Sequence, residues 1–161
     1  EFDGNLTFFV VSGYRSLDLQ RKYFIKEYNK IKSKNNSRLS NDELINLAHL
    51  KMAAPDVAGH PTGGAIDITI LNAKTNKMID MGSKIFDLAD SKIETYSPGL
   101  SGIQKQNRLL LHNILVKQKF CPFYGEWWHF SYGDREWAFF YNKVLAIYSQ
   151  IKKPIKDKTV N

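Results

Sequence analysis

Residues 59–70, GHPTGGAIDITI, combine a histidine beside a proline, a pair of glycines and an aspartate within a run of isoleucines. In an extended strand successive side chains point to opposite faces, so the three isoleucines share one face that can pack in a core. Asp67 then points to the other face. The sequence therefore predicts a strand over residues 65–71 that lies in the core on its isoleucine side and projects Asp67 toward whatever lies opposite.

His60 precedes Asp67 by seven residues, across Gly63 and Gly64. Glycine adopts backbone conformations closed to other residues, so this loop can fold back sharply and bring the imidazole beside the carboxylate. Histidine and aspartate form a ligand pair suited to zinc. For this pair alone, the alternative is an aspartate at a strand end that accepts hydrogen bonds from loop backbone groups.

A second stretch, GEWWHFSY at residues 125–132, supplies Glu126 and His129 with two tryptophans between them. His129 would complete a set of three protein ligands and leave a fourth position open for water, which is typical of catalytic zinc sites. Glu126 would take the proton of the acidified water and pass it to a leaving amine, while Trp127 and Trp128 would wall the site. The alternative is an amphipathic strand whose Glu126 and His129 face solvent.

A third stretch, SGYRS at residues 12–16, places Arg15 directly after an apolar segment, LTFFVV at residues 6–11, which we expect to be a buried strand. The guanidinium presents fixed donors that can bind a substrate carboxylate or stabilise a developing oxyanion. A surface ion pair is the alternative for this residue alone.

The remaining pattern interleaves helices with strands. Ser16 can cap a helix, and Ser40 with Glu43 has the spacing of a capping box. Residues 137–149, WAFFYNKVLAIYS, fit either a helix or a hairpin, and their aromatic and β-branched content favours the hairpin. The expected strands are 6–11, 65–71 and the end of 126–132, and the expected helices are 16–32, 40–53 and 101–118.

This order of elements predicts an α+β fold with a mainly antiparallel sheet. With 161 residues, 43% of them hydrophobic and 13% aromatic, the chain is expected to form a single globular domain, with residues 152–161 as a basic tail. Cys121 is the only cysteine, which excludes an internal disulfide and a multi-cysteine zinc site. No apolar run approaches the roughly 18 residues of a membrane span.

The formal net charge of +7 raises the question of an anionic partner. The lysines are scattered along the chain without a nucleic-acid-binding motif, so we expect no nucleic-acid partner. An anionic polymer such as a cell wall would still attract the protein weakly. The chain begins with Glu1 rather than Met, which suggests a processed or engineered start. The compartment therefore stays open between the cytoplasm and the periplasm or cell envelope, as does the oligomeric state.

Taken together, SGYRS, GHPTGGAID and GEWWHFSYGDREWA resemble the signatures of the zinc D-alanyl-D-alanine peptidases, peptidase family M15. The family pattern H-x6-D followed by E-x-W-H falls on His60, Asp67, Glu126 and His129. MGSKIFD at residues 81–87 and QNRLLLHNIL before the last motif are most similar to the dipeptidase branch, whereas SGYRSLDLQ is also similar to the related D,D- and L,D-carboxypeptidases.

The resemblance implies one Zn²⁺ bound by His60, Asp67 and His129, with Glu126 as the general base and Arg15 stabilising the tetrahedral intermediate. It also implies the hedgehog-like α+β fold of these peptidases. The implied reaction is hydrolysis of D-alanyl-D-alanine to two D-alanines in bacterial peptidoglycan metabolism.

For the substrate pocket, the resemblance implies Asp87 as the partner of the substrate ammonium group, and we expect Trp128 to contact the peptide. The chain departs from many dipeptidases in having Ala58 and Gly59, without a serine, before the first histidine. Two alternatives remain: a carboxypeptidase that trims murein stem peptides, and a non-catalytic zinc domain that binds a partner protein. The presence of both Glu126 and Arg15 disfavours the latter.

Overall fold

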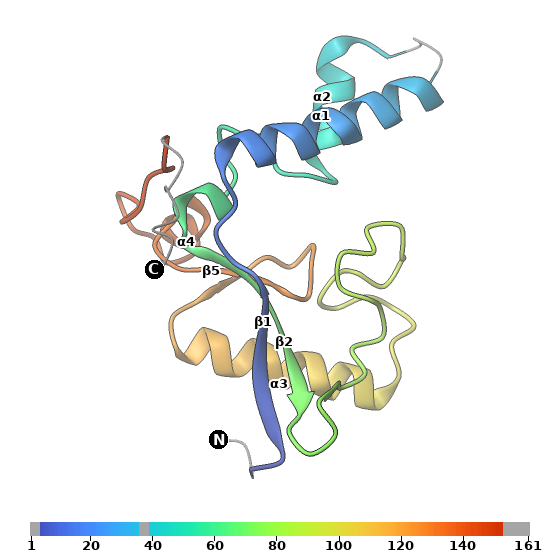
Figure 1. The fold of residues 1–161 in the computed structure, drawn as a ribbon, viewed down its shortest axis with the longest axis vertical. Helices are drawn as coiled ribbons and strands as arrows, with labels where there is room; N and C mark the ends of the chain where they lie inside the picture. The colour runs from blue at the N-terminus through green and yellow to red at the C-terminus, as the bar shows by residue number, and fades with distance from the viewer. Residues whose placement is uncertain (1–3, 36–38, 153–161) are drawn as a thin grey trace, which may run out of the picture.

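The sheet that organises the molecule is antiparallel, and helices lie beside it (Figure 1). A computed structural model describes residues 4–35 and 39–152, so the predicted tail at 152–161 lies almost wholly outside the described residues. The α+β class predicted from the sequence is confirmed. In chain order the elements are β1 (Leu6–Ser12), α1 (Leu17–Lys34), α2 (Asn41–His49), the 3₁₀ helix η1 (His60–Thr62), β2 (Ala65–Asn72), β3 (Lys77–Met78), α3 (Gly102–Lys117), β4 (Cys121–Pro122), β5 (His129–Ser131) and α4 (Arg135–Phe140).

The order of paired strands is β1-β2-β5-β4, with β3 also pairing to β2. β2 therefore lies between β1 and β5. The register sets Asp67 opposite His129 on β5, and opposite Ser12 at the end of β1. This arrangement brings together three segments that are far apart in the sequence.

β2 is buried on both faces. Ile68 and Ile70 are 4% and 0% exposed, and they pack in a core with Leu111 and Leu115 of α3, which covers this side of the sheet (Figure 1). The predicted alternation is confirmed for this face. The opposite face is buried as well, since Asp67 is 1% exposed, whereas the period-2 pattern had placed it outside the core.

The helix starts follow the predicted caps. Ser16 accepts a hydrogen bond from the Leu19 backbone, and Ser40 and Glu43 form the predicted capping box. α2 ends at His49, four residues before the predicted end. α1 and α2 pack against each other and extend away from the sheet (Figure 1). Within residues 4–35 and 39–152, no helix has the length and apolar character needed to cross a membrane.

The prediction that residues 6–11 form a buried strand is half wrong. The strand is present as β1, but Phe9 and Val10 are 43% and 53% exposed. β1 is at the end of the strand order, paired to β2, so much of its apolar surface stays accessible in the described structure. Apolar content predicts strand structure, but it does not tell an edge strand from a central one.

The hairpin favoured for residues 137–149 is also wrong. This region begins with α4, whose first turn is capped by Asp134: its carboxylate accepts a hydrogen bond from the Trp137 backbone. Trp137 is buried, and Asn142 takes a φ of 50°, beyond the end of the helix. Residues 143–150 form no strand. A local N-cap and the burial of the indole outweigh the β propensity of the aromatic residues.

Candidate metal centre

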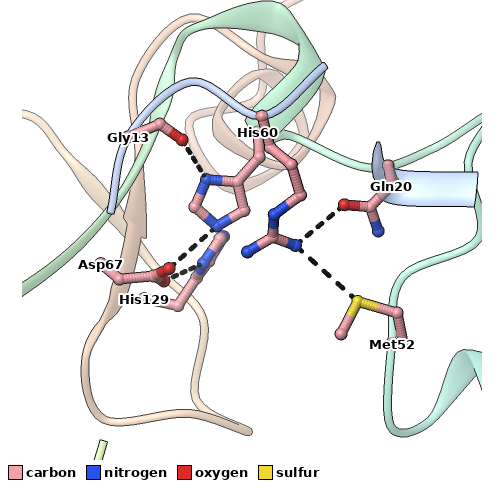
Figure 2. Close-up of polar contacts among 7 residues, drawn as sticks. Gly13, Gln20, Met52, His60, Asp67 and His129 are labelled. Carbon is pink, nitrogen blue, oxygen red and sulfur yellow. Dashed lines mark hydrogen bonds and ion pairs between the residues drawn. The ribbon is translucent and has the colours of Figure 1, made fainter. Parts of the chain in front are cut away.

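Three side chains predicted from the sequence converge at one point (Figure 2). His60 comes from η1, Asp67 from β2 and His129 from β5, and one ligand atom of each lies within 4.8 Å of the others. Asp67 Oδ2 is 3.2 Å from His60 Nε2, and Asp67 Oδ1 is 3.0 Å from His129 Nδ1. The carboxylate thus lies between the two imidazoles, whose ring centroids are 4.9 Å apart.

The glycine pair has the role predicted for it in folding the loop back. Gly63 ends η1 with a φ of 77°, in the left-handed region that favours glycine. A Cβ on Gly64 would overlap the backbone oxygen of Tyr132, and Tyr132 N donates a hydrogen bond to Gly64 O. The chain can therefore return to the sheet immediately after His60 and continue into β2.

The His60 ring is oriented by the backbone of a distant segment. Its Nδ1 atom is 2.7 Å from the carbonyl oxygen of Gly13, just after β1 (Figure 2). Because a carbonyl only accepts, the ring donates from Nδ1 to Gly13, and Nε2 is the ring atom that faces Asp67. Such an outer hydrogen bond is the usual way in which proteins fix the orientation of a histidine ligand.

The site keeps Asp67 ionised. Burial by itself raises the pKa of this carboxyl, but its contacts with His129 and His60 outweigh burial and hold the pKa well below its usual range. For His129, burial would lower the pKa, but the hydrogen bond and charge of Asp67, helped by Glu126 and Glu136, raise it. An ionised carboxylate at the centre of the cluster is what metal binding requires.

Two imidazoles and one carboxylate form a donor set that fits zinc. Asp67 Oδ2 is buried and accepts no hydrogen bond of good geometry in the described part of the chain, although His60 Nε2 lies near it. A buried carboxylate oxygen without a hydrogen-bond partner lowers the stability of the fold unless another group, such as a cation, binds it. Three protein ligands also leave a fourth tetrahedral position open, as in catalytic zinc sites.

Glu126 lies beside this cluster, in the turn that precedes β5. The turn is closed by hydrogen bonds from Glu126 N to Phe123 O and from His129 N to Glu126 O, each 3.1 Å long. Burial raises the pKa of the Glu126 carboxyl, and the neighbouring charges of His129 and Arg15 oppose this effect. The predicted acid is thus close to both a metal-ligand candidate and the predicted arginine.

Arg15 adjoins the site through backbone and side chain. Its N–H donates to the His60 carbonyl at 3.3 Å. Its Nη1 donates to Gln20 Oε1 at 2.9 Å and faces Met52 Sδ at 3.8 Å, and Figure 2 marks these two contacts at Gln20 and Met52. The guanidinium also lies 5.3 Å from the centre of the Tyr23 ring. These contacts hold the side chain in one orientation.

Gln20 is a residue that the sequence analysis missed. It is 1% exposed, and its Nε2 donates to the Ala53 carbonyl at 2.7 Å while its Oε1 receives Arg15. A signal was available, because position 20 falls on the inward stripe of α1 that otherwise carries apolar side chains such as Phe24. A polar residue on such a stripe indicates a buried hydrogen-bond partner.

The two tryptophans between Glu126 and His129 have different surroundings. Trp128 is fully buried, meets the ring of Phe86 edge-on at 6.0 Å, and lies close enough to Glu126 to lower its pKa. Its indole N–H nevertheless has no acceptor of good geometry among the described residues. Trp127 donates its indole N–H to Ser83, on the loop before α3. Trp128 is therefore a neighbour of Glu126, and its contact with the peptide stays a prediction.

Asp87 is not brought into the cluster. Its Oδ1 accepts a hydrogen bond from Ala89 N at 3.3 Å, within a turn of the loop between β3 and α3. It lines a separate cavity of about 420 Å³, which also includes Thr69 and Trp127. Thr69 is two residues along β2 from Asp67, so the cavity begins close to the candidate metal centre without including it.

Comparison with known proteins identifies similarity to one peptidase family along most of the chain. The peptidase M15 family model, described as D-ala-D-ala dipeptidase, matches residues 5–150. Three curated D-alanyl-D-alanine dipeptidases are similar in sequence. That of Synechocystis sp. is 36% identical over 94 residues, which cover 52% of this chain and 38% of the relative. That of Enterococcus faecium is 34% identical over 77 residues, which cover 48% of this chain and 38% of the relative. That of Enterococcus faecalis is 29% identical over 108 residues, which cover 67% of this chain and 51% of the relative. This chain thus spans between 38% and 51% of the length of these relatives.

Solved structures also align with the chain. One is a mutant of the vancomycin resistance D,D-pentapeptidase VanY in complex with Zn(II), with 18% identity, a TM-score of 0.47, and coverage of 90% of this chain and 71% of that chain. Another is VanYB in complex with D-alanine-D-alanine, with 18% identity, a TM-score of 0.49, and coverage of 90% and 70%. Both are less similar in sequence than the curated relatives.

Proposed function

We propose that this chain, which belongs to the D-ala-D-ala dipeptidase family, is a zinc peptidase that hydrolyses D-alanyl-D-alanine to two D-alanines in bacterial cell-wall metabolism. Family membership follows from the model that matches residues 5–150. Activity and substrate are proposed, because the chain spans only part of its curated relatives. The observation that carries the proposal is the convergence of His60, Asp67 and His129 beside Glu126.

His60, Asp67 and His129 would hold the zinc ion. Zinc bound there supplies Lewis acidity, which polarises the scissile carbonyl and lowers the pKa of water. The Gly13 carbonyl keeps Nε2 of His60 available as a ligand. One carboxylate and two neutral imidazoles leave a net positive charge at the site when a dication binds, which favours an electron-rich carbonyl oxygen.

Glu126 and Arg15 would carry the proton and charge transfers. In this proposal the Glu126 carboxylate takes a proton from the attacking water and delivers it to the amine of the departing D-alanine. Arg15 directs its guanidinium donors at the negative charge that develops on the carbonyl oxygen. The backbone hydrogen bond from His129 N to Glu126 O supports the assignment of Glu126, and the bond from Arg15 N to the His60 carbonyl supports that of Arg15.

Two residues are proposed to bind the substrate. Trp128 is supported by its place beside Glu126 and by an indole N–H that has no acceptor of good geometry in the described part of the chain. Asp87 would pair with the free ammonium group of the dipeptide. It is supported by the resemblance of residues 81–87 to the dipeptidases and by the contact of its neighbour Phe86 with Trp128.

The test compares two substrates on zinc-loaded protein. D-Ala-D-Ala is incubated in parallel with an N-acylated peptide that ends in D-Ala-D-Ala, and released D-alanine is quantified. Release from the free dipeptide alone is the expected result. Release mainly from the acylated peptide would identify a carboxypeptidase that acts on stem peptides, and no release from either would favour a zinc domain that binds a partner protein.

A second measurement isolates the general base. Glu126→Gln is expected to keep one zinc per chain and to lose at least about a hundredfold in kcat, which is the usual contribution of general acid–base catalysis. Glu27→Gln, at a glutamate on α1 that pairs with Lys30, is the matched control and should keep wild-type activity. A Glu126→Gln protein that binds zinc and hydrolyses at the wild-type rate would remove this mechanism.

A further inference from the structure

A buried arginine on α3 binds the loop that precedes this helix. Arg108 is 2% exposed, and its Nε donates to Met81 O at 2.6 Å. Its Nη2 donates to Lys92 O at 2.6 Å and to Ser83 Oγ at 3.4 Å, and its Nη1 donates to Glu94 O. One guanidinium thus joins three backbone carbonyls from two parts of the loop to a rigid helix.

These partners are all neutral. A buried charge is expensive, and its burial is repaid only when the surrounding hydrogen bonds are complete and well oriented. The planar guanidinium can satisfy several acceptors in fixed directions at once, which a lysine ammonium in the same place cannot do. The arrangement therefore fixes the path of residues 81–94 more narrowly than apolar packing would.

The same loop holds the turn that carries Glu126. Ile93, between two of the carbonyls bound by Arg108, accepts a hydrogen bond of 3.0 Å from Trp127 N. Thr95 N donates to Tyr124 O at 2.9 Å. These two bonds attach the turn to the loop on both sides of Glu126.

Side chains add a second connection between Arg108 and the turn. The indole N–H of Trp127 donates to Ser83 Oγ at 2.9 Å, and this hydroxyl also receives Arg108. The guanidinium lies 5.6 Å from the centre of the Trp127 ring, within the range of a cation–π contact. Trp127, which follows Glu126, is therefore linked to Arg108 directly through its ring and Ser83, and indirectly through its backbone bond to Ile93.

We propose that Arg108 is a positioning residue for Glu126. It acts through residues 92–95 and Trp127, and it fixes the turn that carries Glu126. This inference rests on the proposed function, because it assigns Glu126 the role of general base. Misplacing a catalytic group by about 1 Å costs about a hundredfold in rate, so a residue that holds the turn contributes to catalysis without touching substrate.

The test uses Arg108→Lys, with Lys105→Ala at an exposed position on the same helix as the matched control. Zinc content, kcat, KM for D-Ala-D-Ala and amide hydrogen exchange are measured on each protein. Arg108→Lys is expected to keep one zinc per chain and to leave KM within about twofold, while kcat falls by about 10- to 100-fold. The amides of Trp127 and Thr95 should exchange faster, and those of β2 should not.

Ser83→Ala provides a milder variant if Arg108→Lys fails to fold. It keeps the buried cation and removes the hydroxyl that links Arg108 to the Trp127 indole, so kcat should fall severalfold at unchanged zinc content. An unchanged kcat in folded, zinc-loaded variants would overturn the proposal. So would faster exchange throughout the sheet, because Arg108 would then be a general stabilising residue.

Failure of the proposed function has a different signature. Wild-type protein that releases no D-alanine from either peptide would overturn that function and, with it, the catalytic part of this inference. The exchange measurement would still decide whether Arg108 holds the turn, because it needs no substrate. Slower exchange of the Trp127 and Thr95 amides in the wild type than in Arg108→Lys, with no difference in β2, would support the positioning role. Equal exchange rates of these amides in the wild type and in Arg108→Lys would refute it.

Discussion

Arg15 donates a hydrogen bond of 2.9 Å from Nη1 to Oε1 of Gln20, a side chain that is 1% exposed. The other end of the same amide donates to the Ala53 carbonyl at 2.7 Å, so its orientation is fixed. Gln20 thus links the arginine beside the candidate metal centre to the segment that follows α2. A guanidinium held in this way loses little conformational entropy when it binds a developing charge.

Replacement of Gln20 with leucine should weaken catalysis without affecting zinc. Leucine fills the buried space but removes the acceptor of Arg15 and leaves the Ala53 carbonyl without its donor. We expect kcat/KM to fall about tenfold, which corresponds to about 1.4 kcal/mol of transition-state stabilisation, with zinc content unchanged. Asn29→Ala, at an exposed position on the same helix, is the control. A Gln20→Leu enzyme as active as the control would show that Arg15 does not depend on Gln20.

Zinc should stabilise the folded protein through Asp67. A ligand present at about 100 times its Kd adds about 2.7 kcal/mol to the free energy of unfolding. For a chain of this size that raises Tm by roughly 5–10 °C, measured by thermal unfolding with zinc and with a chelator. Asp67→Asn keeps the shape of the side chain but lacks the charge, so its Tm should not respond to zinc. Asp87→Asn is the matched control, and zinc should raise its Tm as much as that of the wild type. If zinc did not raise the Tm of Asp87→Asn, Asp87 would be a ligand.

Part of the candidate ligand cluster could be predicted from the sequence, because the placement of His60 beside Asp67 is local to one strand and two glycines. Alternation within β2 sets the direction of Asp67, the Gly63 and Gly64 pair returns His60 to the sheet, and both effects are properties of neighbouring residues. The pairing of Asp67 with His129 is a long-range register that no local pattern contains. His129 was therefore predicted as the third ligand from the chemistry of its own motif and from the family resemblance, and the register itself was not predicted.

Other features depend on tertiary context and could not be predicted in the same way. The exposure of β1 depends on its position in the strand order, and the burial of both faces of β2 depends on what packs against each face. The α4 helix depends on one cap, Asp134, whose effect exceeds the β propensity of the residues after it. The role of Asp87 stays a prediction from resemblance, because no local pattern says which cavity a loop residue will line; in the structure it lines a cavity with Thr69 and Trp127.

Gly59 should tolerate no side chain. A Cβ at this position would overlap Oδ2 of Asp134, which is itself 1% exposed, and would press against Ala65. Gly59→Ala should therefore destabilise the protein by about 1–3 kcal/mol and, because His60 is the next residue, weaken zinc binding. Gly102→Ala is the control: a Cβ there meets open space at the start of α3, so stability should rise by about 0.4–1 kcal/mol. Equal unfolding midpoints in denaturant would contradict this difference.

Cys121 should be an unreactive thiol in the folded protein. It is 4% exposed, and burial raises its pKa to about 12, with the charges of Glu136 and Asp134 adding to the effect. At pH 8 the thiolate is therefore scarce and shielded, so labelling by a thiol reagent should be at least about 100-fold slower than in denaturant. Similar rates in the two conditions would show that the thiol is accessible or ionised in the native state.

The same pKa shift predicts how stability depends on pH. Below pH 9.0, the ordinary pKa of the thiol, Cys121 is neutral in both the folded and the unfolded chain and adds no pH dependence. Between pH 9.0 and about 12 the unfolded thiol loses its proton while the folded one keeps it, which favours unfolding as the pH rises. The free energy of unfolding of the wild type should thus fall relative to that of Cys121→Ala above pH 9.0, measured by urea denaturation at matched pH. Because the variant retains every other titrating group, their contributions cancel, and a difference that stays constant up to pH 10.5 would contradict the shift.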